Sequence, residues 1–208
     1  MQPEYQIKTE AELEARLGTP MEFVRAKIQT RIDDAMRQFV ERSPLVLVST
    51  MDSDGLLDVS PKGDPAGFIQ ITSEGDLLIP ERPGNRLAMG FRNILANGRI
   101  GLLFVVPNQR ETLRVKGIAT LHTDPDLLEG MTVNGKPALM YTRVKVSACF
   151  VHCGKAMIRS KLWQPDSWGD NKVSLGARAF AALGGELTSE RVQETERRLD
   201  QSYKDALY

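Results

Sequence analysis

The feature that most constrains the fold is a series of short apolar segments separated by turn-forming residues, between positions 45 and 150. Residues 45–50 are rich in β-branched side chains and end at the turn cluster 52–55, and residues 100–106 are apolar throughout. Such segments predict strands, and the continuous one predicts a central strand. The other predicted strands are 57–60, 68–72, 77–79, 112–121 and 143–150. These segments amount to about six short strands, with one helix inserted after the fourth, and they predict a small six-stranded antiparallel β-barrel rather than a parallel sheet.

Amphipathic helices are predicted on both sides of this barrel. Thr9 and Glu12 have the spacing of a capping box, and Gly18 ends that first helix. A longer helix is predicted from Thr19 to position 42, and a last one from Thr188. The fold class is therefore mainly β with flanking helices (α+β). We expect N-terminal helices packed on the barrel (1–43), the barrel core (44–165), and a C-terminal loop and helix (166–208) within a single domain.

The composition excludes several classes of protein. Lysine and arginine number 27, as do aspartate and glutamate, so the formal charge is zero and predicts neither nucleic-acid nor anionic-membrane binding. No apolar run is long enough to cross a bilayer, and the polar residues 1–4 do not resemble a signal peptide, so a cytoplasmic location is expected. Neither a dinucleotide-binding glycine motif nor a P-loop is present.

The two cysteines, Cys149 and Cys153, are four positions apart and fit neither a disulfide framework nor a C-x-x-C pair. His152 lies between them, but zinc prefers four ligands and the other histidine, His122, belongs to a different segment. The sequence therefore predicts free thiols and no metal site.

The stretch 77–97 has the features of an anion site. An apolar strand is followed by the turn Pro80-Glu81-Arg82-Pro83-Gly84-Asn85-Arg86 and then by a helical pattern that begins near Gly84. The first amides of a helix have no intrahelical partner and carry partial positive charge. A phosphate bound there would meet these amides together with the guanidinium groups of Arg82 and Arg86. An ordinary strand-to-helix turn with two solvated arginines is the alternative.

Several motifs occur in a recognisable order. They are Ser60-Pro61-Lys62-Gly63-Asp64, the turn 79–86, the strand pair around 102–104 and 112–117, His152-Cys153-Gly154-Lys155-Ala156, and Arg159-Ser160-Lys161-Leu162-Trp163. In this order the chain resembles the pyridoxamine 5′-phosphate oxidase-like flavoproteins, and among them the branch with S-P-K-G-D and H-C-x-K-A signatures. The resemblance covers roughly residues 40 to 165.

This resemblance implies a split β-barrel that forms a homodimer and holds flavin mononucleotide (FMN) at the subunit interface. It assigns the phosphate to basic and hydroxyl side chains of the early strands and the following turn, and it places a basic strand residue and the late motifs near the flavin ring. The implied FMN-binding residues are Ser60, Pro61, Lys62, Gly63, Asp64, Pro80, Arg82, Asn85, Arg86, Arg114, His152, Lys155, Arg159 and Trp163.

Each of these residues also has a structural interpretation. Lys62 and Arg82 can be solvated loop charges, and Arg114 can face water from an alternating strand. His152 can be a packed, hydrogen-bonded histidine. Trp163 can anchor the core or a dimer interface.

The resemblance implies an FMN-dependent oxidoreductase acting on a small molecule, with no catalytic residue assigned. The alternatives are a flavin-binding or sensing protein without turnover and, with less support, a haem-handling split barrel, which needs an axial histidine. The chain lacks the C-terminal arginine and histidine signature of true pyridoxamine 5′-phosphate oxidases, which argues against vitamin B6 oxidation. Its neutral charge does not favour the wide basic groove of deazaflavin-binding relatives.

Overall fold

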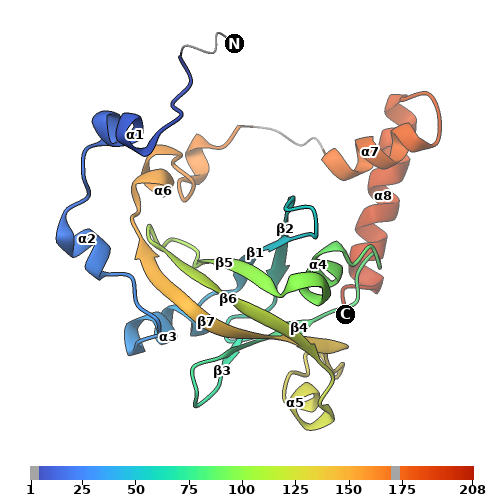
Figure 1. The fold of residues 1–208 in the computed structure, drawn as a ribbon. Helices are drawn as coiled ribbons and strands as arrows, with labels where there is room; N and C mark the ends of the chain where they lie inside the picture. The colour runs from blue at the N-terminus through green and yellow to red at the C-terminus, as the bar shows by residue number, and fades with distance from the viewer. Residues whose placement is uncertain (1–4, 170–173) are drawn as a thin grey trace.

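The computed structural model describes residues 5–169 and 174–208, and its centre is one antiparallel sheet (Figure 1). The strands are β1 (Leu45–Met51), β2 (Leu57–Gly63), β3 (Gln70–Ile71), β4 (Leu77–Glu81), β5 (Arg99–Val105), β6 (Thr112–His122) and β7 (Met140–His152). The helices are α1 (Glu10–Leu17), α2 (Glu22–Ala26), α3 (Asp34–Glu41), α4 (Met89–Asn97), α5 (Pro125–Glu129), α6 (Lys155–Arg159), η2 (Pro165–Ser167), α7 (Leu175–Leu183) and α8 (Ser189–Asp205).

The strand order is β2-β1-β5-β6-β7-β4-β3. All the predicted strand segments are confirmed, and β5 lies inside the sheet between β1 and β6, as its apolar sequence predicts. Over the described residues the sheet has seven strands, one for each predicted segment and one more than the predicted six-stranded barrel, and it does not close. The short β3 extends the edge by pairing with only Leu77 and Leu78 of β4. The fold is thus of the mainly β, split-barrel type with flanking helices.

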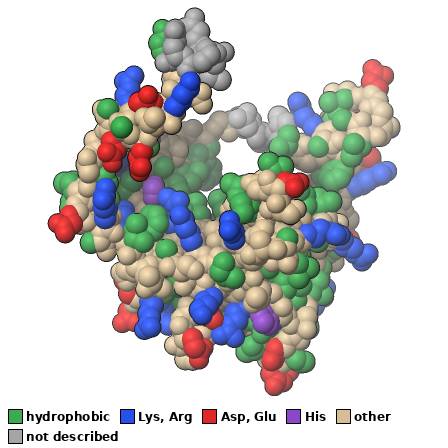
Figure 2. Space-filling model, in the orientation of Figure 1, with side chains coloured by type: hydrophobic (Ala, Val, Ile, Leu, Met, Phe, Trp, Pro, Cys, Tyr) green, Lys and Arg blue, Asp and Glu red, His purple; other side chains and the backbone are tan. Residues whose placement is uncertain are grey.

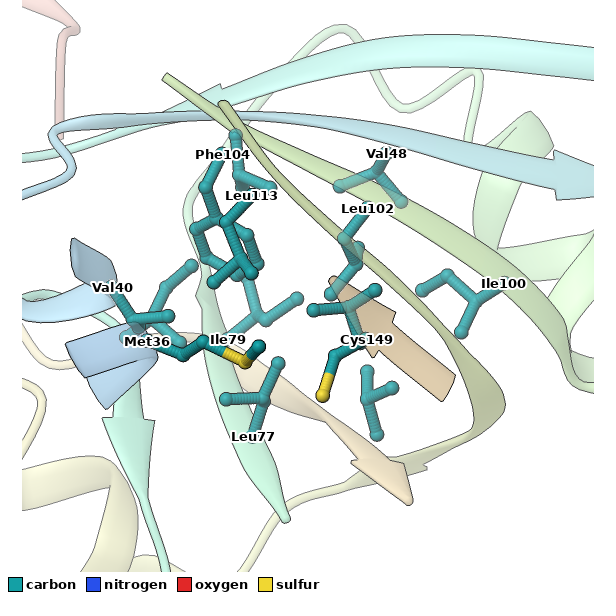
Figure 3. Packing of buried hydrophobic residues seen from close by; sticks show 14 of the residues in the cluster. Met36, Val40, Val48, Leu77, Ile79, Ile100, Leu102, Phe104, Leu113 and Cys149 are labelled. Carbon is teal, nitrogen blue, oxygen red and sulfur yellow. The ribbon is translucent and has the colours of Figure 1, made fainter. Parts of the chain in front are cut away.

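The hydrophobic core is formed by side chains of the strands together with those of α3 (Figure 3). Val46 and Val48 of β1 alternate with outward residues and pack with Leu102 and Phe104 of β5, because successive side chains of a strand point to opposite faces. Helix α3 covers this core with Met36, Phe39 and Val40. Burial of such side chains contributes roughly 1.5–3 kcal/mol each.

The N-terminal region departs from the prediction of one long helix after Thr19. Helix α2 ends at Ala26, Gln29 forms a β-bridge with Cys149 of β7, and α3 begins only after Asp33. Two interactions replace the continuous helix. Gln29 pairs with Cys149 in the part of β7 that β4 leaves unpaired, and the Asp33 carboxylate accepts the Met36 amide at 2.8 Å. This hydrogen bond lowers the pKa of Asp33.

The first and last predicted helices are confirmed, with their predicted caps at Thr9 and Thr188. Among the described residues, α1 and α2 bury no side chain, whereas α7 packs against α8 through Ala177 and Ala181. The sequence did not predict α7. Figure 1 shows α1 and α2 on one side of the sheet and the α7–α8 hairpin on the other.

Some predictions fall partly outside the described residues. These are the reading of residues 1–4 as a polar, non-signal N-terminus and part of the loop predicted at 164–174. Among the described residues, no helix has the length and apolar character to cross a membrane.

Candidate functional site

A cavity of about 370 Å³ lies between β1, β2, the end of β4, the first turn of α4 and the start of β7. Five of the residues predicted to bind phosphate line it: Ser60, Lys62, Arg82, Asn85 and Arg86. The side chains of Asp58, Thr50, Glu81, Phe91 and Thr142 complete its polar and aromatic wall, and Ile79, Leu139 and Met140 are among its apolar members. Its volume falls at the lower end of the range of small-molecule sites.

Strand β2 supplies one wall through its alternation. Asp58, Ser60 and Lys62 are half-buried on the cavity side, whereas Leu57 and Val59 are exposed on the other face. Strand β2 extends beyond the predicted end at position 60, because residues 61–63 pair with residues 45–47 of β1. Pro61 fits because β2 is an edge strand and needs no second ladder partner.

A buried ion pair crosses the cavity. The Lys62 Nζ lies 2.6 Å from Glu81 Oε2, and the Thr142 hydroxyl donates to Glu81 Oε1 at 2.8 Å. The Glu81 side chain is only 4% exposed and that of Lys62 is 24% exposed. Burial raises the pKa of Glu81, while the charge of Lys62 and the hydrogen bonds from Lys62 and Thr142 oppose that rise. The Lys62 ammonium also lies 4.4 Å from the centre of the Phe91 ring.

A second ion pair lies beside the first. Arg82 donates from Nε to Asp64 Oδ2 at 2.7 Å and from Nη2 to the Met131 carbonyl at 2.8 Å. Its Nη1 is buried without a hydrogen-bond partner among the described residues. The Tyr208 hydroxyl donates to Asp64 at 2.9 Å, and this hydrogen bond raises the pKa of Tyr208. The guanidinium of Arg82 is therefore oriented by groups outside the cavity.

The turn between β4 and α4 lines one side of the cavity with residues 84–88. Arg86 and Ala88 have φ values of 63° and 55°, in the left-handed region, and the Asn85 side chain accepts the Leu87 amide at 3.0 Å. Helix α4 begins at Met89 rather than near Gly84, which corrects the prediction. Among the described residues no side chain caps it, and Met89, Gly90 and Phe91 line the cavity. Its first amides are thus open to an anion.

The remaining predicted residues lie elsewhere. Pro61, Gly63 and Pro80 are strand residues that do not line this cavity, and Asp64 is occupied by Arg82 and Tyr208. Trp163 donates to the Gln109 carbonyl at 2.7 Å. Lys155 and Arg159 belong to the short helix α6. Seven predicted residues line neither this cavity nor the groove described next: Pro61, Gly63, Asp64, Pro80, Lys155, Arg159 and Trp163.

Arg114 and His152 line a second, larger groove of about 910 Å³ on the opposite face of the sheet. The Arg114 guanidinium lies 5.1 Å from the Phe150 ring centre. Most of the groove is formed by β1, β2, β5 and β6, with Leu57 and Val59 strongly exposed. Figure 2 shows the molecule hollowed between its N-terminal helices and the α7–α8 hairpin, with hydrophobic side chains at the base of the hollow.

Sequence reasoning missed the rest of the polar and aromatic wall, which is formed by Thr50, Asp58, Glu81, Phe91 and Thr142. Of these residues, Glu81 was the easiest to predict from the sequence, because it belongs to the turn already identified as a candidate anion site. The predicted strand ended at Ile79, whereas β4 continues through Pro80 to Glu81 with every residue buried. A carboxylate directly after an apolar run was the available signal. Thr142 is distant in sequence and only the pairing of β4 with β7 brings it near.

Both cysteines are free, with Cys149 buried and Cys153 exposed. The described residues contain no cluster of three or more histidine, cysteine, aspartate or glutamate side chains arranged to hold a metal.

Comparison with solved structures finds similar proteins at low sequence identity. HupZ of Group A Streptococcus is 19% identical, with a TM-score of 0.47 over 58% of this chain and 99% of its own. General stress protein 26 of Bacillus anthracis is 12% identical, with a TM-score of 0.44 over 55% and 88%. HutZ, the heme storage protein from Vibrio cholerae, is 13% identical, with a TM-score of 0.38 over 58% and 94%. No protein with a curated description matches the sequence.

A family model gives the more specific result. The model described as pyridoxamine 5′-phosphate oxidase matches residues 32–153, which include α3, all seven strands and α4. This region contains the whole of the cavity lined by Lys62, Glu81 and Arg86. The chain therefore belongs to the pyridoxamine 5′-phosphate oxidase family.

Proposed function

We propose that this protein binds FMN and is an FMN-dependent oxidoreductase that acts on a small molecule. One observation carries the proposal: Ser60, Lys62 and Arg86 line the same cavity as the uncapped first turn of α4. A phosphate monoester needs several charge-assisted donors in one place, and this arrangement supplies cations, hydroxyls and helix amides together. Membership of the family, and the S-P-K-G-D and P-E-R-P-G-N-R motifs within the matched region, support FMN as the ligand.

The charges of the cavity residues fit this ligand. Three cations, Lys62, Arg82 and Arg86, and two carboxylates, Asp58 and Glu81, contribute to the lining. Arg86 is exposed at the mouth, so its guanidinium can turn toward a ligand at little cost. The unpartnered Nη1 of Arg82 is a further donor close to the site. Lys62 is paired with Glu81, so a phosphate would compete with that carboxylate.

Bound FMN would supply hydride and electron transfer, and the protein would supply binding and electrostatics. Lys62 and Arg86 would hold the phosphate, with Ser60 and the first amides of α4 as neutral donors. Ile79, Phe91 and Met140 would exclude water from the apolar part of the cavity. Glu81 holds the Lys62 ammonium inside the cavity before the ligand arrives.

We also propose that the protein is a homodimer, with the second copy covering the apolar groove on the opposite face of the sheet. Leu57 and Val59 are 72% and 61% exposed there, and Leu47 and Leu103 extend the apolar surface. Exposed apolar patches of this kind mark association sites. Arg114 and His152 lie in this groove, on the opposite face of the sheet from Lys62, so both would be residues of the dimer interface.

The experiment that tests the function starts with the purified protein. The expected result is a flavin absorbance spectrum, or saturable uptake of added FMN, at about one FMN per chain. Reduction of that flavin by NADPH or NADH, with passage of electrons to an acceptor, would distinguish an oxidoreductase from a flavin-binding protein without turnover. A protein that is colourless and takes up no FMN under native conditions would refute the proposal.

A further inference from the structure

Among the described residues, Glu81 is the one buried acidic residue that itself lines the cavity, and it is paired with a cavity cation. Its carboxylate contacts the Lys62 ammonium from β2 and the Thr142 hydroxyl from β7. Each of its oxygens therefore has one hydrogen-bond donor. The pair is neutral overall when Glu81 is ionised, and that ionised state depends on Lys62.

The other charged groups around the cavity belong to β2 and to the turn between β4 and α4. Asp58 lies on the same face of β2 as Lys62, and Arg86 belongs to the turn before α4. Arg82 follows Glu81 directly, but its guanidinium is paired with Asp64. The residues that α4 contributes to the lining are uncharged, and so are those of β1 and β7. Lys62 is thus the one cation in hydrogen-bond contact with Glu81 among the described residues.

A dianionic ligand at Lys62 would change the surroundings of Glu81 in two ways. It would draw the ammonium away from the carboxylate, and it would add negative charge nearby. Both changes disfavour an ionised carboxylate in a site with so little exposure to water. Burial already raises the pKa of Glu81, and the charge of Lys62 is the largest influence that opposes this.

We propose that Glu81 takes up one proton from solvent when a phosphate monoester dianion binds at Lys62. This inference rests on the proposed FMN function and extends it to the charge state of the ligand. The proton comes from water or buffer and joins the Glu81 carboxylate, while Lys62 keeps its charge and pairs with the phosphate. The cavity thereby gains one net positive charge on binding. A ligand without the phosphate leaves the Lys62–Glu81 pair intact and brings no proton.

The test is isothermal titration calorimetry of the full chain with FMN and, separately, with riboflavin. Titrations at about pH 7 in two buffers of different ionisation enthalpy give the number of protons exchanged, and at this pH the phosphate itself is mostly dianionic. The wild-type protein is expected to take up about one proton per FMN, which makes the apparent affinity weaken up to about tenfold per pH unit. Riboflavin binding is expected to exchange none.

Glu81→Gln removes the titrating group and keeps the approximate shape of the side chain. Its FMN binding is expected to lose the proton uptake and the associated pH dependence, whereas Glu129→Gln, at an exposed position on α5, is expected to behave as the wild type. Circular dichroism tests whether each variant is folded. If Glu81→Gln does not fold, the wild-type measurement still tests the inference, because absence of proton uptake by the wild type contradicts it. FMN binding without proton uptake by the wild type, or with equal uptake in Glu81→Gln, overturns the inference and leaves the proposed function standing. Absence of FMN binding overturns both.

Discussion

The Lys62 ammonium lies 2.6 Å from the Glu81 carboxylate and joins strands that are far apart in the sheet order. Strand β2 is one edge of the sheet, and β4 lies next to the opposite edge. The Arg82–Asp64 pair makes a second connection between the ends of the same two strands. The two ion pairs therefore bridge the opening of the split barrel, and the candidate FMN cavity lies directly at this opening.

Breaking the Arg82–Asp64 pair is expected to destabilise the fold, because it leaves one buried charge without its partner. Asp64 is only 2% exposed, so Arg82→Met would leave a buried carboxylate without its cation and lower the free energy of unfolding by about 3–5 kcal/mol. Arg143→Met is the matched control, because its pair with Asp76 is far more exposed and a much smaller loss is expected. Urea unfolding without FMN measures both. Equal losses in the two variants would contradict this account.

The stability of the protein should depend on pH through Glu81. Burial raises the pKa of Glu81 in the folded protein above its ordinary value of 4.5, so the unfolded chain ionises first as pH rises. Between these two pKa values the folded protein holds more protons, and its free energy of unfolding falls with rising pH by about 1.4 kcal/mol for each unit of pKa difference. Urea unfolding over a pH series should show the wild type losing stability relative to Glu81→Gln above pH 4.5. If the difference in free energy of unfolding between the wild type and Glu81→Gln stays constant with pH, burial does not raise the pKa of Glu81.

Arg86 is expected to contribute to FMN binding and not to the stability of the fold. Its side chain is exposed, and Arg86→Ala should weaken FMN binding by about 1.5–3 kcal/mol, the scale of a hydrogen bond to a charged group. Fluorescence titration of FMN measures the change, and Arg16→Ala on the exposed helix α1 is the control. An unchanged dissociation constant in Arg86→Ala would remove this residue from the phosphate site.

The proposed dimer should depend on the apolar groove. Val59→Glu places a charge on its exposed surface and should convert the dimer to a monomer, because burying an unpaired carboxylate is costly. Light scattering measures the mass. Leu127→Glu, on α5 away from the groove, should leave the dimer intact. A wild-type protein that is monomeric with FMN bound would refute the dimer.

Most of the fold followed from local patterns. Apolar and β-branched segments predicted each strand, and the capping residues Thr9 and Thr188 predicted where helices begin. The single helix predicted after Thr19 was wrong, because the stripe of apolar residues cannot reveal that β4 leaves the end of β7 unpaired and available to Gln29. Helical periodicity is satisfied equally by one helix and by segments that pack separately.

The site was predictable where its residues are close in sequence. The motif 60–64 and the turn 80–86 supplied the basic residues, but their pairing with Glu81 and Asp64 depends on how the sheet curls. For the same reason the sequence could not show that Arg114 and His152 lie on the opposite face from Lys62. A one-residue step along a strand reverses the face of a side chain, and that relation becomes clear only with the strand register.

The most direct test of the central claim is a crystal structure of the protein with FMN. The account predicts phosphate oxygens within hydrogen-bond distance of Lys62 and Arg86 at the start of α4, with the Lys62–Glu81 contact lengthened or lost. A phosphate bound elsewhere, or a cavity in which Lys62 and Glu81 remain paired while FMN is bound at another place, would contradict it.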